Sequence, residues 1–156
     1  MSSLASLLTN RDMYMRQEQL SLDIKVKATV VGAGGVGSWV TVFLSLSGVE
    51  DITVYDDDVV EIHNLNRTLY RPEHVGKKKV DVLKEIIPRD INLVTLDKRI
   101  TRDNLSLLRW GEIVFDTSDN DHTHKIIEEA WDRGYFYKLI RASYDGNHIT
   151  LSMNHK

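Results

Sequence analysis

The stretch that decides the fold is Val30-Val31-Gly32-Ala33-Gly34-Gly35-Val36-Gly37. It follows an apolar run typical of a buried strand and precedes an apolar helical segment, and its glycines have the spacing G-x-G-x-x-G. In such a stretch Gly32 allows a tight turn, Gly34 lets a phosphate approach the backbone, and Gly37 lets helix and strand pack closely. Because free N–H groups at a helix start attract anions, this stretch predicts a nucleotide site.

An acidic residue stands at the distance that a nucleotide site requires. Asp56 follows Gly37 by 19 residues and lies at the tip of the next predicted strand. A carboxylate at this place typically accepts a hydrogen bond from a ribose hydroxyl. No Lys-Ser or Lys-Thr follows the last glycine, so the stretch is not a P-loop. It therefore predicts a nucleotide without distinguishing NAD from ATP.

Strands and helices alternate along the rest of the chain. We predict helices over 10–22, 38–47, 78–87, 102–108 and 121–133, and strands over 25–31, 52–55, 92–96, 112–115, 137–142 and a candidate 149–152. Such alternation is typical of βαβ units, and uniformly apolar strands are covered on both faces. We expect an α/β, Rossmann-like fold: a mostly parallel sheet with helices on both faces and an N-terminal helix.

The composition sets limits on the function. At 156 residues with a net charge of -3, one domain over 1–156 is expected, and the balanced charge gives no reason to expect nucleic-acid binding. The chain has no Cys, which excludes a thiol nucleophile, a thioester on this chain and a disulfide. The apolar stretches are too short for a bilayer and the N-terminus is too charged for a signal peptide, so we expect a cytoplasmic protein without membrane contact.

Polar residues after the predicted strands separate ATP from NAD. Asp58 and the segment Asn64-Leu65-Asn66-Arg67 look like a polar cradle for a triphosphate, which a dehydrogenase does not need. Lys79 stands at a helix start, from which it can reach a phosphate. The segment Asp116-Thr117-Ser118-Asp119-Asn120 follows a strand, where ligands of parallel sheets gather, and a carboxylate there could hold Mg²⁺.

Other polar and aromatic residues have simpler interpretations. Asp116 can cap a turn, so it is a weaker candidate than Asp119 for the Mg²⁺ ligand. Arg16 can be a solvated charge on a helix. His122 and His124 are two residues apart on a predicted helix, so they do not face a common ligand and are expected at the surface. Solvent exposure or packing is also expected for Asp57, Glu61, Lys77, Lys78, Trp39 and Trp131.

In its order of motifs the chain resembles the MoeB/ThiF family, which shares its fold with the ubiquitin-activating enzymes. The resemblance covers about residues 11–154. The matching motifs are Tyr14-Met15-Arg16-Gln17, the glycine stretch, Asp56-x-Asp58-x-Val60, Asn64-Leu65-Asn66-Arg67, Gly76-x-x-Lys79 and Asp116-x-x-Asp119-Asn120. The zinc-binding Cys pairs and crossover loop that family members carry further on have no counterpart in this sequence.

The resemblance implies a reaction. It implies binding of ATP·Mg²⁺ and adenylation of the C-terminal glycine carboxylate of a small ubiquitin-like or sulfur-carrier protein, or of a peptide, with release of pyrophosphate. It implies a homodimer or heterodimer in which Arg16 reaches the triphosphate bound by a neighbouring subunit. The resemblance implies four catalytic residues: Arg16, Arg67, Lys79 and Asp119, the last as the Mg²⁺ ligand. It implies nucleotide-binding roles for Gly32, Gly34, Gly35, Gly37, Asp56, Asp58, Asn64 and Asn66.

Two other functions remain open from the sequence. The chain can be a non-catalytic nucleotide-binding subunit that completes another protein, as in heterodimeric activating enzymes. Retention of Arg67, Lys79 and Asp119 favours the enzyme, because an inactive subunit could lose them at little cost. A dehydrogenase is the third possibility.

Overall fold

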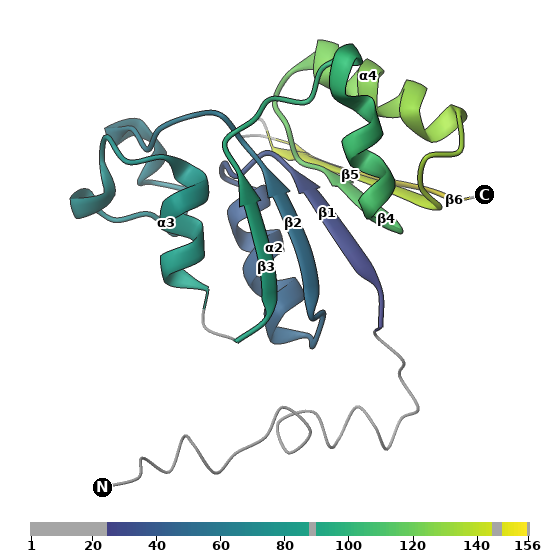
Figure 1. Ribbon diagram of the computed structural model, residues 1–156. Helices are drawn as coiled ribbons and strands as arrows, with labels where there is room; N and C mark the ends of the chain where they lie inside the picture. Colours follow the sequence, from purple (N-terminus) through teal and green to yellow (C-terminus); the bar gives the residue numbers. More distant parts are fainter. Residues whose placement is uncertain (1–24, 88–89, 145–147, 156) are drawn as a thin grey trace, which may run out of the picture.

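The computed structural model describes residues 25–87, 90–144 and 148–155, which form a six-stranded sheet with helices packed against it (Figure 1). The strands stand in the order β3-β2-β1-β4-β5-β6. Strands β1 to β5 pair in parallel, whereas β6 is antiparallel to β5. Their bounds are β1 Lys27–Val31, β2 Asp51–Tyr55, β3 Asn92–Leu96, β4 Ile113–Asp116, β5 Lys138–Tyr144 and β6 Ile149–His155. The predicted mostly parallel sheet is confirmed.

Helices cover both faces of the sheet, as predicted. The described α-helices are α2 Gly37–Leu46, α3 Lys79–Ile86 and α4 Asp121–Asp132, and the 3₁₀ helices are η2 Ile62–Asn64, η3 Pro72–His74 and η4 Arg102–Trp110. Successive strand side chains point to opposite faces, so the neighbours Val30 and Val31 enter different cores. Val30 packs in a cluster with Leu83 of α3 and Leu44 of α2, and Val31 in a cluster with Leu108 of η4 and Ile126 of α4.

The order of the strands places a crevice at one edge of the sheet. From β1 the chain passes through α2 to β2 and then β3 on one side, and it later returns to β4 on the other side. The carboxyl ends of β1 and β4 are therefore a topological switch point, where ligands of such sheets bind. Val31 at the end of β1 is paired in register with Asp116 at the end of β4.

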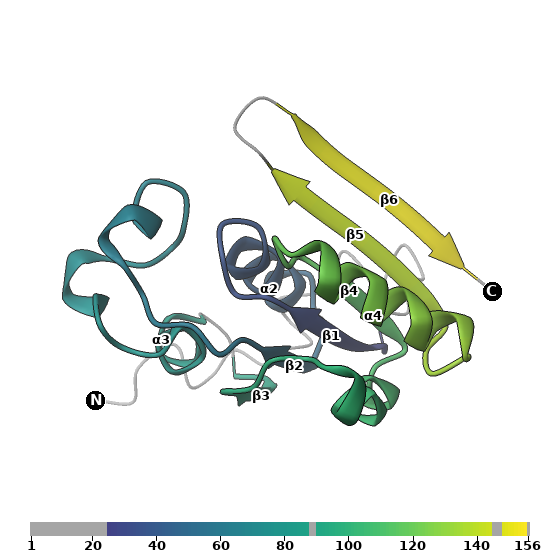
Figure 2. The ribbon, with the colours of Figure 1, turned by 90° about the horizontal axis from the view of Figure 1, so that it is seen from above.

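The bounds differ from the predicted ones where pairing or packing overrides local pattern. The helix predicted over 102–108 is the 3₁₀ helix η4, and it runs on to Trp110. The strand predicted over 149–152 extends to His155, because β6 pairs with β5 from Tyr144↔Ile149 to Lys138↔His155 (Figure 2). The N-terminal helix predicted over 10–22 lies outside the described residues, so it stays a prediction.

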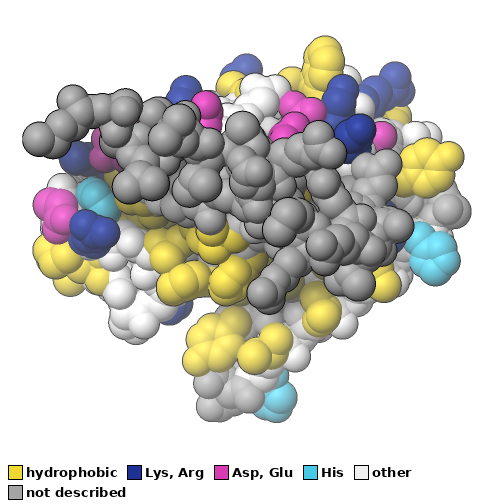
Figure 3. Space-filling view, turned by 90° about the horizontal axis from the view of Figure 1, so that it is seen from below, with side chains coloured by type: hydrophobic (Ala, Val, Ile, Leu, Met, Phe, Trp, Pro, Cys, Tyr) yellow, Lys and Arg dark blue, Asp and Glu magenta, His cyan; other side chains and the backbone are white. Residues whose placement is uncertain are grey.

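The edge strand β6 leaves apolar side chains uncovered. Figure 3, a view from below, shows hydrophobic side chains at the surface of the molecule. Ile149, Leu151 and Met153 lie on one face of β6, and all three are exposed.

Among the described residues no helix is long and apolar enough to cross a membrane.

Two glycines of the turn after β1 are required by close contacts. Gly32 has φ +99°, and an added Cβ would lie 2.9 Å from the carbonyl oxygen of Thr117. At Gly37 an added Cβ would lie 1.8 Å from the carbonyl oxygen of Gly32 and 2.5 Å from Thr117 Oγ1. At Gly34 nothing lies within 4 Å. The turn therefore brings the start of α2 against both β1 and the segment after β4.

Gly37→Ala should lower the free energy of unfolding by at least about 2 kcal/mol, because the new methyl group would collide with backbone rather than with a movable side chain. Gly34→Ala is the matched control and should change the unfolding free energy by less than about 0.5 kcal/mol. Urea denaturation of both variants and the wild type measures the difference. Equal stability of the two variants would show that the contact at Gly37 is unimportant.

Candidate active site at the carboxyl edge of the sheet

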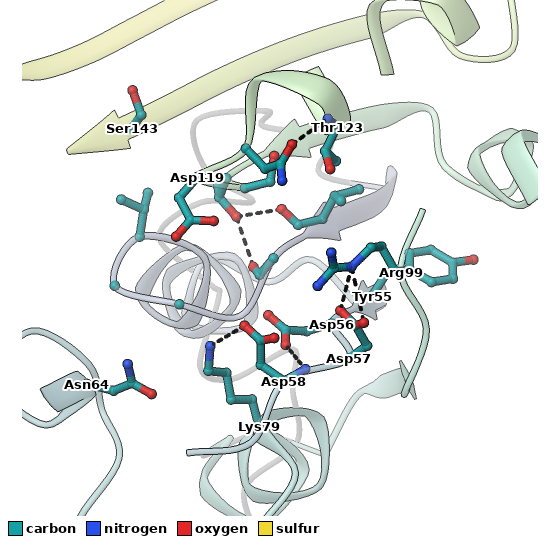
Figure 4. A pocket seen from close by; sticks show the side chains of 18 of the residues that line it. Tyr55, Asp56, Asp57, Asp58, Asn64, Lys79, Arg99, Asp119, Thr123 and Ser143 are labelled. Atoms are coloured by element: carbon teal, nitrogen blue, oxygen red, sulfur yellow. Dashed lines mark hydrogen bonds and ion pairs between the residues drawn. The ribbon is translucent and has the colours of Figure 1, made fainter. Parts of the chain in front are cut away.

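A cavity of about 580 Å³ opens at the switch point (Figure 4). Its lining comes from the carboxyl ends of β1, β2 and β5, from the glycine turn, and from the segments that follow β2, β3 and β4. Its volume lies within the roughly 300–1,000 Å³ common for small-molecule sites. The predicted site residues in the lining are Gly32, Gly34, Gly35, Asp56, Asp58, Asn64, Arg67, Lys79 and Asp119.

The start of α2 faces this cavity without a cap. The residue before the helix, Val36, has no side chain that could accept from the first N–H groups, and the first turn holds no acidic residue. The first hydrogen bond into the helix runs from Ser38 N to Gly34 O at 3.1 Å. Tyr70 fixes the preceding turn, since its hydroxyl donates to Ala33 O at 2.6 Å. Free N–H groups on a fixed helix start attract an anion such as a phosphate.

Asp56 holds the turn and the segment after β2 together. Its Oδ2 accepts from Ala33 N at 2.7 Å, and its Oδ1 accepts from Asp58 N at 2.8 Å. Each oxygen retains a second lone pair, which a ribose hydroxyl could use. Burial is the largest influence on this carboxyl and raises its pKa, while the two N–H donors and the charge of Lys79 act in the opposite direction.

Two cations of the cavity are paired with acids of the same segment. Lys79 opens α3, its side chain is 9% exposed, and its Nζ lies 2.9 Å from Asp58 Oδ2. Arg99, which follows β3, lies 3.1 Å from Asp57 Oδ2 through its Nε. The Arg99–Asp57 pair was missed from sequence, and the expectation that Asp57 is only solvated is wrong. No local motif marks this pair, because its members are brought together by the β2–β3 register.

Arg67 lies across the glycine turn. A Cβ added at Gly35 would meet Arg67 Cγ and Cδ at 3.1 Å, so the arginine stem runs beside that glycine. Its guanidinium donates to His63 O at 2.6 Å and to Asn66 Oδ1 at 3.0 Å. Asn66 is exposed and does not line the cavity, so the structure connects it to the site only through Arg67. Asn64 lines the cavity, but its Oδ1 already accepts from Glu61 N at 2.9 Å.

Asp119 is the acid with the most available carboxylate. It follows β4, lines the cavity and is exposed, and its side chain forms no hydrogen bond or ion pair with another described residue. The next residue, Asn120, caps α4 by accepting from the N–H groups of His122 and Thr123. Asp56, Asp57 and Asp58 offer oxygens within 4.8 Å of one another, so they are a second possible cation-binding group. Oxygen donors of this kind suit Mg²⁺.

Other sequence expectations have mixed outcomes. Asp116 is fully buried instead of capping an exposed turn, and His124 is mostly buried against it, so the prediction of a surface histidine is wrong for His124. Ser118, which lies in the segment expected near the ligand, and Thr123 line the cavity, although neither was among the predicted site residues. Arg16 lies outside the described residues, and its reach into a neighbouring subunit stays a prediction.

The sheet is open and parallel, and its switch point carries an uncapped helix start, the carboxylate of Asp56 and several cations. This arrangement is typical of a Rossmann-type nucleotide-binding domain. A family comparison agrees with this class, since residues 10–141 match the ThiF family. The chain belongs to the ThiF family.

Named relatives extend the comparison. A sulfur carrier protein adenylyltransferase of Thermus thermophilus is 36% identical over 119 residues, which are 73% of this chain and 43% of that protein. A ubiquitin-like modifier-activating enzyme 5 of Arabidopsis thaliana is 37% identical over 147 residues, 92% of this chain and 30% of that protein. The chain therefore spans less than half the length of these two relatives.

A solved structure shows the same fold with a nucleotide. The E. coli tRNA N6-threonylcarbamoyladenosine dehydratase TcdA in complex with AMP has a TM-score of 0.73 and 26% sequence identity. The match covers 83% of this chain and 56% of that chain.

The raised pKa of Asp56 predicts a pH dependence of stability. The folded protein keeps this proton to higher pH than the unfolded chain, in which the value is near 3.8. The contribution of Asp56 is therefore fully present below the unfolded pKa and is lost as pH rises through the folded pKa. Urea denaturation over about pH 3 to 6 should show the stability of the wild type falling relative to Asp56→Asn.

Asp56→Asn also loses a hydrogen-bond acceptor, which changes the free energy of unfolding by the same amount at every pH. Only the slope of the unfolding free energy against pH therefore tests whether the pKa of Asp56 is raised. Parallel curves for the two proteins would mean that burial does not dominate the pKa of this carboxyl.

Proposed function

We propose that this chain transfers AMP from ATP to the C-terminal carboxylate of a small ubiquitin-like or sulfur-carrier protein, or of a peptide. The observation that carries the proposal is the meeting of the uncapped start of α2 with Arg67 and Lys79 in one cavity. Such a group of donors suits a polyphosphate. The names of the relatives, an adenylyltransferase and a ubiquitin-like modifier-activating enzyme, support the same reaction.

The reaction needs charge neutralisation and alignment more than proton transfer. A carboxylate oxygen of the partner attacks the α-phosphorus, the bond to the β-phosphate oxygen breaks, and the products are an acyl-adenylate and pyrophosphate. Both reactants are anionic, so the main obstacle is bringing them together in line. In this proposal the N–H groups at the start of α2, Arg67 and Lys79 bind the phosphates, and Arg99 adds a further positive charge.

The remaining site residues orient the nucleotide. Asp56 accepts from the ribose hydroxyls with the lone pairs that its two backbone donors leave free. In this proposal Asn64 contacts the nucleotide from the cavity wall, Asp58 orients Lys79 through their ion pair, and Asn66 supports Arg67. Asp119, with its available carboxylate, would hold Mg²⁺, which supplies neutralisation of the charge on the phosphate oxygens.

The acyl group stays on the nucleotide until an external nucleophile removes it. The sequence contains no Cys, so this chain cannot accept the acyl group as a thioester. A dimer, in which Arg16 of a neighbouring subunit completes the phosphate site, belongs to the same proposal. The alternative is a nucleotide-binding subunit without its own activity, which would bind ATP but show no exchange reaction.

Asp119→Ala should lower the exchange of labelled pyrophosphate into ATP on the order of 10²–10³-fold, as expected when one charge-stabilising group is lost. The exchange is driven by a small protein or peptide that ends in Gly-Gly. Asp121→Ala is the matched control, because Asp121 is exposed, lies two residues further on and does not line the cavity. Asp119→Ala should melt at the wild-type temperature, since an exposed acid without a partner contributes little to stability. Asp121→Ala removes a negative charge from the first turn of α4 and should melt at most a few degrees lower.

Two results would contradict this proposal in different ways. No exchange by the wild type with any Gly-Gly-ended partner would reject the enzyme in favour of the inactive subunit. Equal exchange by Asp119→Ala and wild type would reject the metal assignment alone, and Asp58 would become the next candidate.

A further inference from the structure

A buried ionic cluster lies directly beneath the segment that carries Asp119. Asp116, the last residue of β4, has no exposed surface. A buried carboxylate is costly unless charged or hydrogen-bonding partners surround it. The proposed reaction uses none of this cluster's charges, and of its members only Ser118 lines the cavity.

Three side chains satisfy Asp116. Ser118 Oγ donates to its Oδ1 at 2.8 Å. His124 Nδ1, from the second turn of α4, lies 2.7 Å from its Oδ2. Arg141 Nε, from β5, donates to the same Oδ2 at 3.0 Å, and Arg141 Nη2 donates to His124 O at 3.2 Å. The cluster therefore joins β4, β5, α4 and the segment between β4 and α4.

The cluster is not a nucleophile with its base. In a serine nucleophile arrangement the serine and the acid contact opposite ring nitrogens of the histidine. Here Ser118 Oγ and Asp116 Oδ2 both lie at His124 Nδ1, at 3.3 and 2.7 Å. The geometry instead suits a fixed support.

What the cluster supports is the segment 117–120. Thr117 is tied to the glycine turn, because its N donates to Val31 O at 3.0 Å and its Oγ1 donates to Gly32 O at 2.9 Å. Asn120 is tied to α4 as its cap. The side chain of Asp119 has no such tie to the described residues, so its place in the cavity depends on how its neighbours are held.

We propose that Asp116, His124 and Arg141 are positioning residues that hold the segment 117–120 so that Asp119 presents its carboxylate to the nucleotide-bound cation. The role of Asp119 rests on the proposed function, whereas the support of the segment by the cluster is a property of the protein without any ligand. The two parts can be tested separately.

The first test is amide hydrogen exchange on the nucleotide-free protein. His124→Ala should speed exchange by about tenfold or more, the effect of losing one hydrogen bond to a charged group, at the two hydrogen-bonded amides that report on this segment. These are the amide of Thr117, which donates to Val31 O, and the amide of Thr123, which donates to the side chain of Asn120. Exchange in α3 should not change. His122→Ala is the matched control, since His122 is exposed and its hydrogen bond to Asn120 uses the backbone N–H. Unchanged exchange at these two amides in His124→Ala would overturn the proposal.

The second test is a double-mutant cycle on ATP affinity, measured by calorimetry with Mg²⁺ present. His124→Ala should weaken binding by about tenfold in the wild type but by less than about twofold in Asp119→Ala, because coupled residues are not additive. Equal weakening in both backgrounds would reject the action through Asp119. His124→Gln, which keeps an N–H donor, should restore affinity and exchange. His124→Phe, which keeps an aromatic ring but has no donor for Asp116, replaces His124→Ala if that variant does not fold. Failure of the wild type to bind ATP would reject the proposed function. The amide hydrogen exchange of the nucleotide-free protein would then still decide whether the cluster supports the segment 117–120.

Discussion

The contact on which the rest of the structure depends is the close approach of Gly37 to the carbonyl oxygen of Gly32. Only a residue without a Cβ fits there, and the same position faces Thr117. The contact lets α2 begin immediately after β1 and aims its free N–H groups into the switch point. Because Thr117 also donates to Gly32 O, the glycine turn and the segment after β4 form one unit. A single local packing constraint therefore places both the start of α2, which is proposed to bind phosphate, and the segment of Asp119, which is proposed to bind a cation.

Around that unit, charged side chains are arranged in pairs that hold one another before any ligand arrives. Lys79 is almost fully buried against Asp58, and Arg99 is paired with Asp57. Holding such groups in advance reduces the reorganisation that a nucleotide must cause when it binds. Asp119 differs from them because its carboxylate has no tie within the described part of the chain. That difference is consistent with an acid whose partner is supplied by the ligand.

Features that depend on the spacing of nearby residues could be predicted from the sequence. The glycine turn, Asp56 at the end of β2 and Lys79 at the start of α3 all follow from short-range pattern, and the structure places them as predicted. The pairs that were missed join residues far apart in sequence. Arg99 meets Asp57 across 42 residues, and Arg141 meets Asp116 across 25, through the registers of neighbouring strands. Helical spacing also gave a wrong expectation for His124. The spacing shows only that His122 and His124 do not face a common ligand, and it carries no information about a contact with the buried acid Asp116.

The central claim is that the cavity is built for a triphosphate rather than for a dinucleotide. Calorimetric titration of the wild-type chain with ATP in the presence of Mg²⁺, and separately with NAD, tests it most directly. The account predicts that ATP binds and that NAD binds far more weakly or not at all, because Arg67, Lys79 and Asp119 line the cavity and a dinucleotide does not need this set of charges. Tighter binding of NAD than of ATP would contradict it.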